Sequence, residues 1–211
     1  MIIRPRAVIG LPFLCACAAV VVGFLTVAPV AVEGASRAAG CSPKGSKTVA
    51  RNGVARVFVS ANRGRLYGCV GRVGRPLLLA KQEADSGDYT SESFDHVELA
   101  GRYAAWRSTH TDVSCKADCP PGYNATSVYV NAADLKRRRT RAIATAVTSL
   151  AVSRRGAVAW TRPSGGGFEL RLSVRRSEDR LVDSGGIDTV GFHDSILAWK
   201  NAGQRTWIEA R

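Results

Sequence analysis

The chain has 211 residues, of which 45% are hydrophobic and 22% are charged, with a formal net charge of +13 at pH 7. This balance is ordinary for a globular protein and excludes a chain that is disordered throughout. The excess of basic residues favours anionic partners.

The first 40 residues have the pattern of a signal peptide or of an N-terminal membrane anchor. Arg4 and Arg6 precede the uncharged stretch 7–32, and Glu33 is the next charged residue. A basic segment followed by an apolar one is typical of an export signal, and this stretch is also long enough to span a bilayer. Both interpretations place the predicted domain, residues 41–211, outside the cytoplasm.

Four cysteines follow the leader, and an even number in an exported chain predicts two disulfides. Cys115 and Cys119 are close in sequence, which predicts a Cys115–Cys119 bridge and leaves Cys41 to pair with Cys69. The segment Ala38-Ala39-Gly40-Cys41 resembles the bacterial lipobox, which implies a lipid on the cysteine. A lipid on Cys41 would prevent the Cys41–Cys69 bridge, so the two hypotheses compete.

Beyond residue 46 the sequence alternates short strand-like runs with turns and has almost no helical periodicity. Asn52-Gly53, between two such runs, is a strong signal for a hairpin. The pattern predicts an all-β domain of four similar units, each an antiparallel meander of four strands. These units cover residues 47–81, 95–144, 148–183 and 189–211.

An Ala-Trp pair ends a short apolar run in three of the units, and Phe58 fills the same place in the first unit. The pairs are Ala105-Trp106, Ala159-Trp160 and Ala198-Trp199. Such units resemble the blades of a β-propeller, which implies that these aromatic residues are buried against neighbouring blades. Their Leu-x-Asp-Ser-Gly and Leu-x-Trp segments are also similar to those of exported repeat proteins of high-GC bacteria, which implies a shape and no activity.

The fourth unit lacks its last strand, although a propeller usually closes by pairing the ends of the chain. Residues 41–46 could supply a strand, but Pro43 has no N–H to donate to a ladder. An open curved sheet or a β-sandwich is therefore kept as an alternative to the propeller.

The segment Val182-Asp183-Ser184-Gly185-Gly186 resembles the nucleophile segment of trypsin-like serine proteases. The resemblance implies Ser184 as the nucleophile, with His110 and Asp134 as its partners. However, Val182 replaces the glycine whose N–H helps to form the oxyanion hole, and the chain is too short for two six-stranded barrels. We predict no catalytic residue and interpret the segment as a strand end followed by a turn.

An insertion at 108–125 interrupts the second unit and presents Tyr123 after a rigid Pro-Pro-Gly turn. Long insertions on a regular scaffold are common places for ligand binding. His110 with the two nearby cysteines could bind zinc, but export favours the disulfide, so we predict no metal and no cofactor. The acidic segment 82–95 matches no calcium loop and is interpreted as a flexible linker.

The densest basic cluster is the predicted turn Lys136-Arg137-Arg138-Arg139, followed by Arg141. Arginines grouped in this way could bind phosphate groups or an acidic polymer. The alternative is a solvated hairpin tip whose charge keeps the sheet edge from pairing with other chains.

These observations predict an exported or membrane-tethered binding or scaffold module of the cell envelope, without enzymatic activity. Anionic lipid headgroups, acidic envelope polymers or a protein are the expected partners, and nucleic acid is not expected. Two alternatives stay open. One is a hydrolase that uses Ser184 or a metal in the insertion, and the other is a structural domain that holds a partner chain along an open sheet edge.

Overall fold

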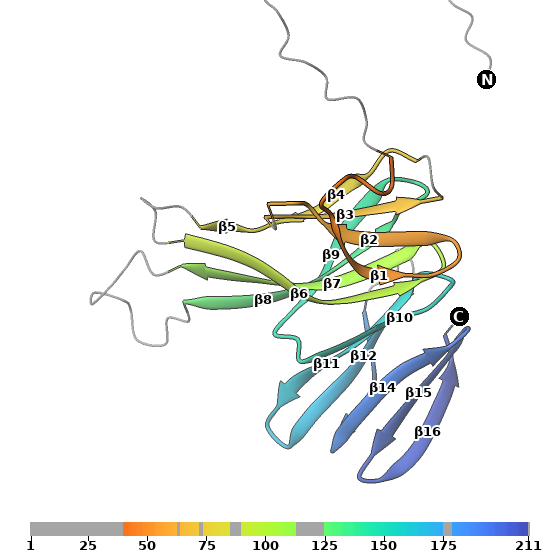
Figure 1. Ribbon diagram of the computed structural model, residues 1–211. Coiled ribbons are helices and arrows are strands. Elements are labelled where there is room, and N and C mark those ends of the chain that lie inside the picture. The colour runs from red at the N-terminus through yellow and green to blue at the C-terminus, as the bar shows by residue number, and fades with distance from the viewer. Residues whose placement is uncertain are drawn as a thin grey trace, which may run out of the picture. The chain divides into compact units, whose positions relative to one another are not determined.

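The computed structural model describes residues 40–210 except 63, 72–73, 85–89, 113–124 and 175–178. Every regular element in this part of the chain is a β-strand, and no helix in it is long and apolar enough to cross a membrane. The strands form four antiparallel sheets that follow one another along the chain (Figure 1), and consecutive sheets pack on each other as propeller blades do. The predicted all-β, propeller-like fold is therefore confirmed.

Each sheet is built from strands that follow one another in the chain. The first sheet contains β1 (Lys47–Arg51), β2 (Ala55–Val59), β3 (Arg65–Val70) and β4 (Leu77–Lys81). The second contains β5 (Glu83–Ala84), β6 (Thr90–Ala100), β7 (Tyr103–Asp112), β8 (Thr126–Asp134) and β9 (Arg139–Thr145). The third contains β10 (Ser149–Val152), β11 (Ala157–Ser164), β12 (Gly167–Val174) and β13 (Arg180–Gly185). The fourth contains β14 (Ile187–His193), β15 (Ile196–Asn201) and β16 (Gln204–Glu209).

The first hairpin turns at Asn52, as the sequence predicts, and the side chain of this residue holds the turn. Its Oδ1 accepts hydrogen bonds from the backbone N–H groups of Val54 at 2.8 Å and Ala55 at 2.9 Å. An asparagine that bonds to the backbone just after it stabilises a tight turn locally. Its Nδ2 donates to the carbonyl of Gly101 at 3.0 Å, so the same residue attaches the first sheet to the second.

The acidic segment 82–95 differs from its interpretation as a flexible linker, because much of it belongs to the second sheet. It supplies β5 and the first half of β6, which begins with Thr90 opposite Asp112 of β7. The guanidinium of Arg107 on β7 donates two hydrogen bonds, of 2.7 and 2.6 Å, to the carboxylate of Asp95. These hydrogen bonds lower the pKa of Asp95, so a neighbouring strand neutralises an acidic side chain of this segment.

Three hydrophobic clusters lie between consecutive sheets and form the core. In each cluster, a buried tryptophan of one sheet joins aliphatic side chains of the preceding sheet. Examples are Trp106 with Val57, Trp160 with Val130, and Trp199 with Leu172. A buried tryptophan removes roughly 200 Å² from water, which contributes at most about 5 kcal/mol to folding. The three tryptophans therefore hold the four sheets together.

The second main strand of each unit carries its large aromatic residue at the same place in the register. The cross-strand pairs are Phe58 with Tyr67, Trp106 with Asn131, Trp160 with Arg171, and Trp199 with Thr206. All four aromatic residues are buried. The prediction that Phe58 fills the place of the later tryptophans is therefore confirmed.

The fourth sheet has three strands, as the sequence predicts, and residues 41–46 do not complete it. These residues lie against the first sheet, where Cys41 forms a disulfide with Cys69 of β3 and their Cα atoms are 5.8 Å apart. Nη1 of Arg56 donates to the carbonyl of Cys41 at 2.6 Å. The predicted Cys41–Cys69 bridge is confirmed, and it holds the start of the described chain at the first sheet.

Candidate functional site

A cavity of about 530 Å³ lies where the second and third sheets meet, and four arginines line it. We call it the arginine cavity. Its cationic residues are Arg102, Arg137, Arg139 and Arg141, and the only carboxylate among its lining residues is Asp134. An excess of positive charge in a partly enclosed space raises the local concentration of anions.

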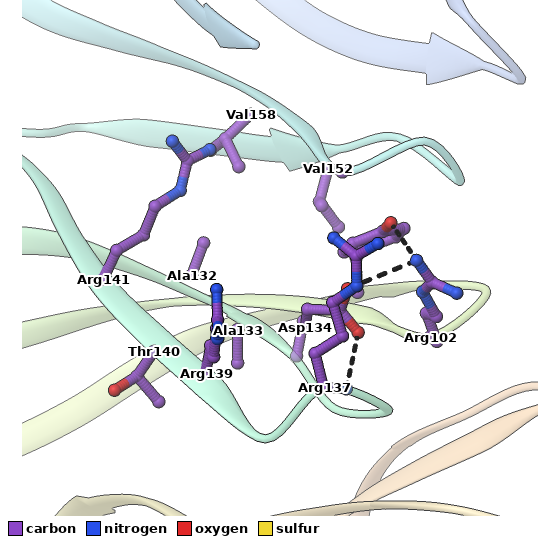
Figure 2. Close-up of a pocket in the computed structure, with 13 residues that line it drawn as sticks. Arg102, Ala132, Ala133, Asp134, Arg137, Arg139, Thr140, Arg141, Val152 and Val158 are labelled. Carbon is purple, nitrogen blue, oxygen red and sulfur yellow. Dashed lines mark hydrogen bonds and ion pairs between the residues drawn. The ribbon is translucent and has the colours of Figure 1, made fainter. Parts of the chain in front are cut away.

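The other walls of the arginine cavity are mostly small and apolar. They are formed by Ala104, Ala132, Ala133, Val152 and Val158. Figure 2 shows Arg139 beside Ala133, and Arg141 extending toward Val158 of the third sheet. Arg137 and Arg139 are exposed, whereas Arg141 is partly buried, and electrostatic attraction is stronger where water is scarce. The shape suits a small molecule with one anionic group and a short apolar part.

Asp134, at the end of β8, forms the turn that leads into β9. Its Oδ1 accepts hydrogen bonds from the backbone N–H groups of Lys136 and Arg137, both at 3.1 Å. Its Oδ2 lies 3.3 Å from Nη2 of Arg102 and 3.9 Å from Nε of Arg137. The single carboxylate of the cavity therefore positions the basic hairpin and neutralises part of its charge.

Arg102 lies in the turn between β6 and β7 and is held by the residue next to it. Its Nη2 donates to the hydroxyl of Tyr103 at 2.8 Å, and its guanidinium lies over the Tyr103 ring, 5.0 Å from the centroid. The hydrogen bond to Tyr103, together with the charge of Asp134, raises the pKa of Arg102 against the effect of desolvation. Its Nε is enclosed and has no hydrogen-bond partner within the described residues.

Arg139 and Arg141 lie two positions apart on β9 and therefore on the same face of the strand. Nη1 of Arg141 donates to Oγ of Ser173 on β12 at 3.2 Å. Burial lowers the pKa of Arg141. In the part of the chain that the structure describes, neither Arg139 nor Arg141 forms an ion pair. These two guanidinium groups are the ones available to bind an anion.

Only three of the five basic residues predicted to bind anions line the arginine cavity. Arg137, Arg139 and Arg141 line the arginine cavity, whereas Lys136 and Arg138 do not. Arg138 adopts a left-handed conformation, with φ of +55°. This conformation turns its side chain toward the first sheet, where it donates to the carbonyls of the 75–76 turn at 2.7 and 3.4 Å. Arg138 is therefore a tether between two sheets.

Two predicted features of the insertion lie outside the described residues. They are Tyr123 and the Cys115–Cys119 bridge. Within the described ranges, no group of three histidine, cysteine, aspartate or glutamate side chains is placed to hold a metal ion.

The residues that resemble a serine-protease triad lie at three separate places. Ser184 is on β13, where it pairs with Glu169 of the same sheet. His110 pairs with Ser127 toward the far end of β7, while Asp134 lies opposite Tyr103 at the near end of the same strand pair. The neighbour of Ser184, Asp183, binds the indole of Trp199 instead of a histidine. The segment is therefore a structural contact between the third and fourth sheets.

Arg102, which the fold places beside the basic hairpin, was not among the residues predicted from the sequence. It lies more than thirty residues before the hairpin and has no basic neighbour in the sequence. The only local signal was its position just after the Ala100-Gly101 turn, which predicts a hairpin and no particular side-chain contact. Pairing of β7 with β8 then brings Arg102 to Asp134.

Searches for similarity to known proteins do not identify this chain with a family. No protein-family model matches the sequence, and no curated protein matches it. Its function must therefore be inferred from the geometry of its own residues.

Proposed function

We propose that this domain is a binding module for anionic ligands, which it holds in the arginine cavity. One observation carries the proposal: four arginines and one carboxylate line a single cavity, and two of these arginines form no ion pair with a described residue. An arginine without a counter-charge can form charge-assisted hydrogen bonds with an anionic group. The ligand supplies that charge.

The chemistry of the donors indicates which anions bind. Guanidinium groups are planar and donate pairs of parallel hydrogen bonds, a geometry that matches carboxylate and phosphate oxygens. Arg139 and Arg141 offer two such groups on one face of β9. The guanidinium of Arg102 lines the same cavity, but it faces the carboxylate of Asp134 and its Nε is enclosed. We therefore expect phosphate or carboxylate groups to bind at Arg139 and Arg141.

The setting that we propose is the cell envelope, with the domain exported or tethered to a membrane. The leader pattern of residues 1–40 supports export. The Cys41–Cys69 disulfide supports an oxidising compartment, because such bonds are rare in reducing ones. In that setting, anionic lipid headgroups and acidic envelope polymers both present phosphate or carboxylate groups.

The test is a calorimetric titration with inorganic phosphate, carried out at low salt and again at physiological ionic strength. We expect saturable binding that weakens as salt is added, because salt screens the attraction. The double variant Arg139→Ala/Arg141→Ala is expected to bind at least tenfold more weakly. Its matched control is Arg180→Ala/Arg205→Ala, which removes the same charge from exposed positions on β13 and β16 and is expected to bind like the native protein.

Equal binding by the native protein and the Arg139→Ala/Arg141→Ala variant would show that the arginine cavity is not the site. Two further ligands then distinguish the sources of the anion. Vesicles that contain an anionic lipid test for a headgroup, and soluble polyphosphate tests for a polymer. If none of these ligands binds to folded protein, the domain is structural and the proposal is wrong.

A further inference from the structure

The carboxylate of Asp183 joins the third sheet to the fourth through a tryptophan side chain. Its Oδ2 accepts hydrogen bonds from Nε1 of Trp199 at 2.6 Å and from Nδ2 of Asn201 at 3.0 Å. Trp199 and Asn201 lie two positions apart on β15. The third sheet therefore supplies a carboxylate that accepts hydrogen bonds from two side-chain N–H groups of the fourth sheet.

We number the interfaces in chain order, so the first lies between the first and second sheets and the third between the third and fourth sheets. The register of the strands shows which residues take the place of Asp183 at the first and second interfaces. In each of the first three sheets, the buried aromatic residue (Phe58, Trp106 or Trp160) pairs with a residue of the next strand. A β-bulge lies directly beside that paired residue. The last pair before this bulge is Leu170 with Asp183 in the third sheet. The equivalent pairs are Leu66 with Ala80 in the first sheet and Val130 with Ala144 in the second. The first two interfaces therefore have alanine where the third has a carboxylate.

At the second interface, the protein itself closes the space beside the tryptophan. Trp160 is fully buried, and its Nε1 is enclosed without a hydrogen-bond partner in the described part of the chain. Ala144 and its neighbour Ile143 pack against the same cluster. This N–H is therefore closed to any ligand.

At the first interface, a second cavity of about 410 Å³ lies in the equivalent place. We call it the tryptophan cavity. It is lined by Trp106 and by Ala80, the residue that replaces Asp183. Within the described residues, no hydrogen bond of the Trp106 side chain is present. Like the second interface, the first interface has an alanine at the position of Asp183. Unlike the second, it also has a space large enough for a small molecule.

Ser108 is the residue at the first interface that corresponds to Asn201 at the third. It lies two positions after Trp106, as Asn201 lies two positions after Trp199, and it lines the tryptophan cavity. Its Oγ accepts a hydrogen bond from Nδ2 of Asn131 at 2.7 Å. Because that bond uses a lone pair of the oxygen, the hydroxyl proton stays available to donate. The cavity is therefore lined by an indole and a hydroxyl whose places on β7 correspond to those of the two donors to Asp183 on β15.

We propose that the tryptophan cavity binds a small carboxylate ligand, whose carboxylate takes the place that Asp183 occupies at the third interface. The Trp106 indole and the Ser108 hydroxyl donate to it, as Trp199 and Asn201 donate to Asp183. This site is separate from the arginine cavity, which lies between the second and third sheets and is lined by guanidinium groups.

The other lining residues describe the rest of this ligand. Lys81, His110 and Glu92 also line the cavity. Lys81 has the carboxylate of Glu83 at 3.3 Å, and Nδ1 of His110 lies 3.7 Å from the carboxylate of Glu92. Because Lys81 already has a counter-charge, a second anionic group on the ligand would find no unpaired cation. The walls also include Tyr129. We therefore expect a monocarboxylate with a neutral, partly polar body.

The first experiment follows the indole N–H resonances of the ¹⁵N-labelled protein while acetate is added at constant ionic strength. The chain has four tryptophans, and Trp106→Phe assigns the relevant resonance. We expect the Trp106 resonance to shift saturably in the millimolar range, since a ligand of four non-hydrogen atoms binds weakly. Acetamide, which has the same shape without the charge, is expected to cause a shift at least tenfold smaller.

The decisive variant is Ala80→Asp, which places a carboxylate of the chain at the position equivalent to Asp183. We expect it to move the Trp106 resonance without ligand and to abolish the response to acetate. Leu78→Asp is the matched control, because it adds the same charge to an exposed position on the same strand and is expected to keep the response. Ser108→Ala is expected to weaken acetate binding about tenfold and tests the site if Ala80→Asp does not fold.

Three results would overturn the proposal. They are a Trp106 resonance that does not respond to acetate, an equal response to acetamide, and an acetate response that survives both Ala80→Asp and Ser108→Ala. The Arg139→Ala/Arg141→Ala variant is expected to respond to acetate like the native protein. A failure at one cavity is therefore distinguishable from a failure at the other.

Discussion

The ring of Tyr103 in the second sheet lies directly against the backbone of Gly156 in the third. A methyl group on Gly156 would come within 2.7 Å of Cε1 of Tyr103. Gly156 also has φ of +85°, a conformation that other residues rarely adopt. Because both residues line the arginine cavity and Tyr103 holds Arg102, this contact sets the spacing of the two sheets at the proposed site.

The substitution Gly156→Ala is expected to destabilise the protein by about 2–4 kcal/mol. The new Cβ would clash with a ring that packing holds in place, and the left-handed backbone would be strained. Urea denaturation measures the change. Gly165→Ala is the control, because no atom lies within 4 Å of its added Cβ, and it is expected to change stability by less than about 0.5 kcal/mol. Equal stability of the two variants would contradict the tight contact.

Removing the carboxylate of the arginine cavity is expected to strengthen anion binding. Asp134→Asn keeps a side-chain oxygen that accepts from the N–H groups of Lys136 and Arg137, so the turn is retained. It removes the negative charge 3.3 Å from Arg102. We expect phosphate to bind about three- to tenfold more tightly, because the repulsion is lost. Calorimetric titration checks this, and weaker binding by the variant would place the anion elsewhere.

Asp183 is expected to make part of the stability depend on pH. Burial raises the pKa of this carboxyl, but hydrogen bonds from Trp199, Asn201 and the backbone N–H of Ser184 outweigh burial, so the net pKa lies below its ordinary value. A lowered pKa in the folded state contributes stability that is complete above the unfolded pKa of about 3.9. That contribution is lost as the pH falls through the folded pKa.

The measurement compares the native protein with Asp183→Asn by urea denaturation between pH 7 and pH 3. The native protein is expected to be more stable by about 1–2 kcal/mol at neutral pH, since the donors bind a charged acceptor more strongly. The difference is expected to stay constant down to about pH 5 and to shrink below pH 4. A difference that stays constant to pH 3 would show that the charge of Asp183 does not contribute.

The Cys41–Cys69 bridge is expected to contribute about 3–4 kcal/mol to stability. Its sequence separation is 28, and closing a loop of that length removes conformational entropy from the unfolded chain by this amount. The double variant Cys41→Ser/Cys69→Ser, and the native protein in reductant, are both expected to show this loss in urea denaturation. Full stability in reductant would contradict the estimate.

Much of the fold could be predicted from local patterns, because each local pattern has a local physical cause. The side chain of Asn52 can bond to the backbone that follows it, so the first hairpin is encoded within four residues. Phe58 and the three buried tryptophans follow turns at similar distances in the sequence. This spacing predicts that they occupy equivalent positions in the register of their sheets. The acidic segment 82–95 was misread because its neutralising partner, Arg107, lies on another strand.

The candidate sites could be predicted only in part, because they depend on residues that are distant in the chain. Arg139 and Arg141 were found as members of a basic run, but Arg102 was not. Arg138 belongs to the same run, yet its positive φ turns it toward the first sheet. The tryptophan cavity had no local signal, because Ala80 becomes informative only when its register is compared with that of Asp183.

By itself, the sequence determined the strand class, the four units, the aromatic residue of each unit and the partner of Cys41. These features follow from turn chemistry, from alternation along a strand and from the number of cysteines. Only the tertiary structure decided which arginines face one cavity and which buried indole has a carboxylate beside it. The reason is that strand pairing and sheet packing bring together side chains from different units, and their meeting depends on a register that no single segment specifies.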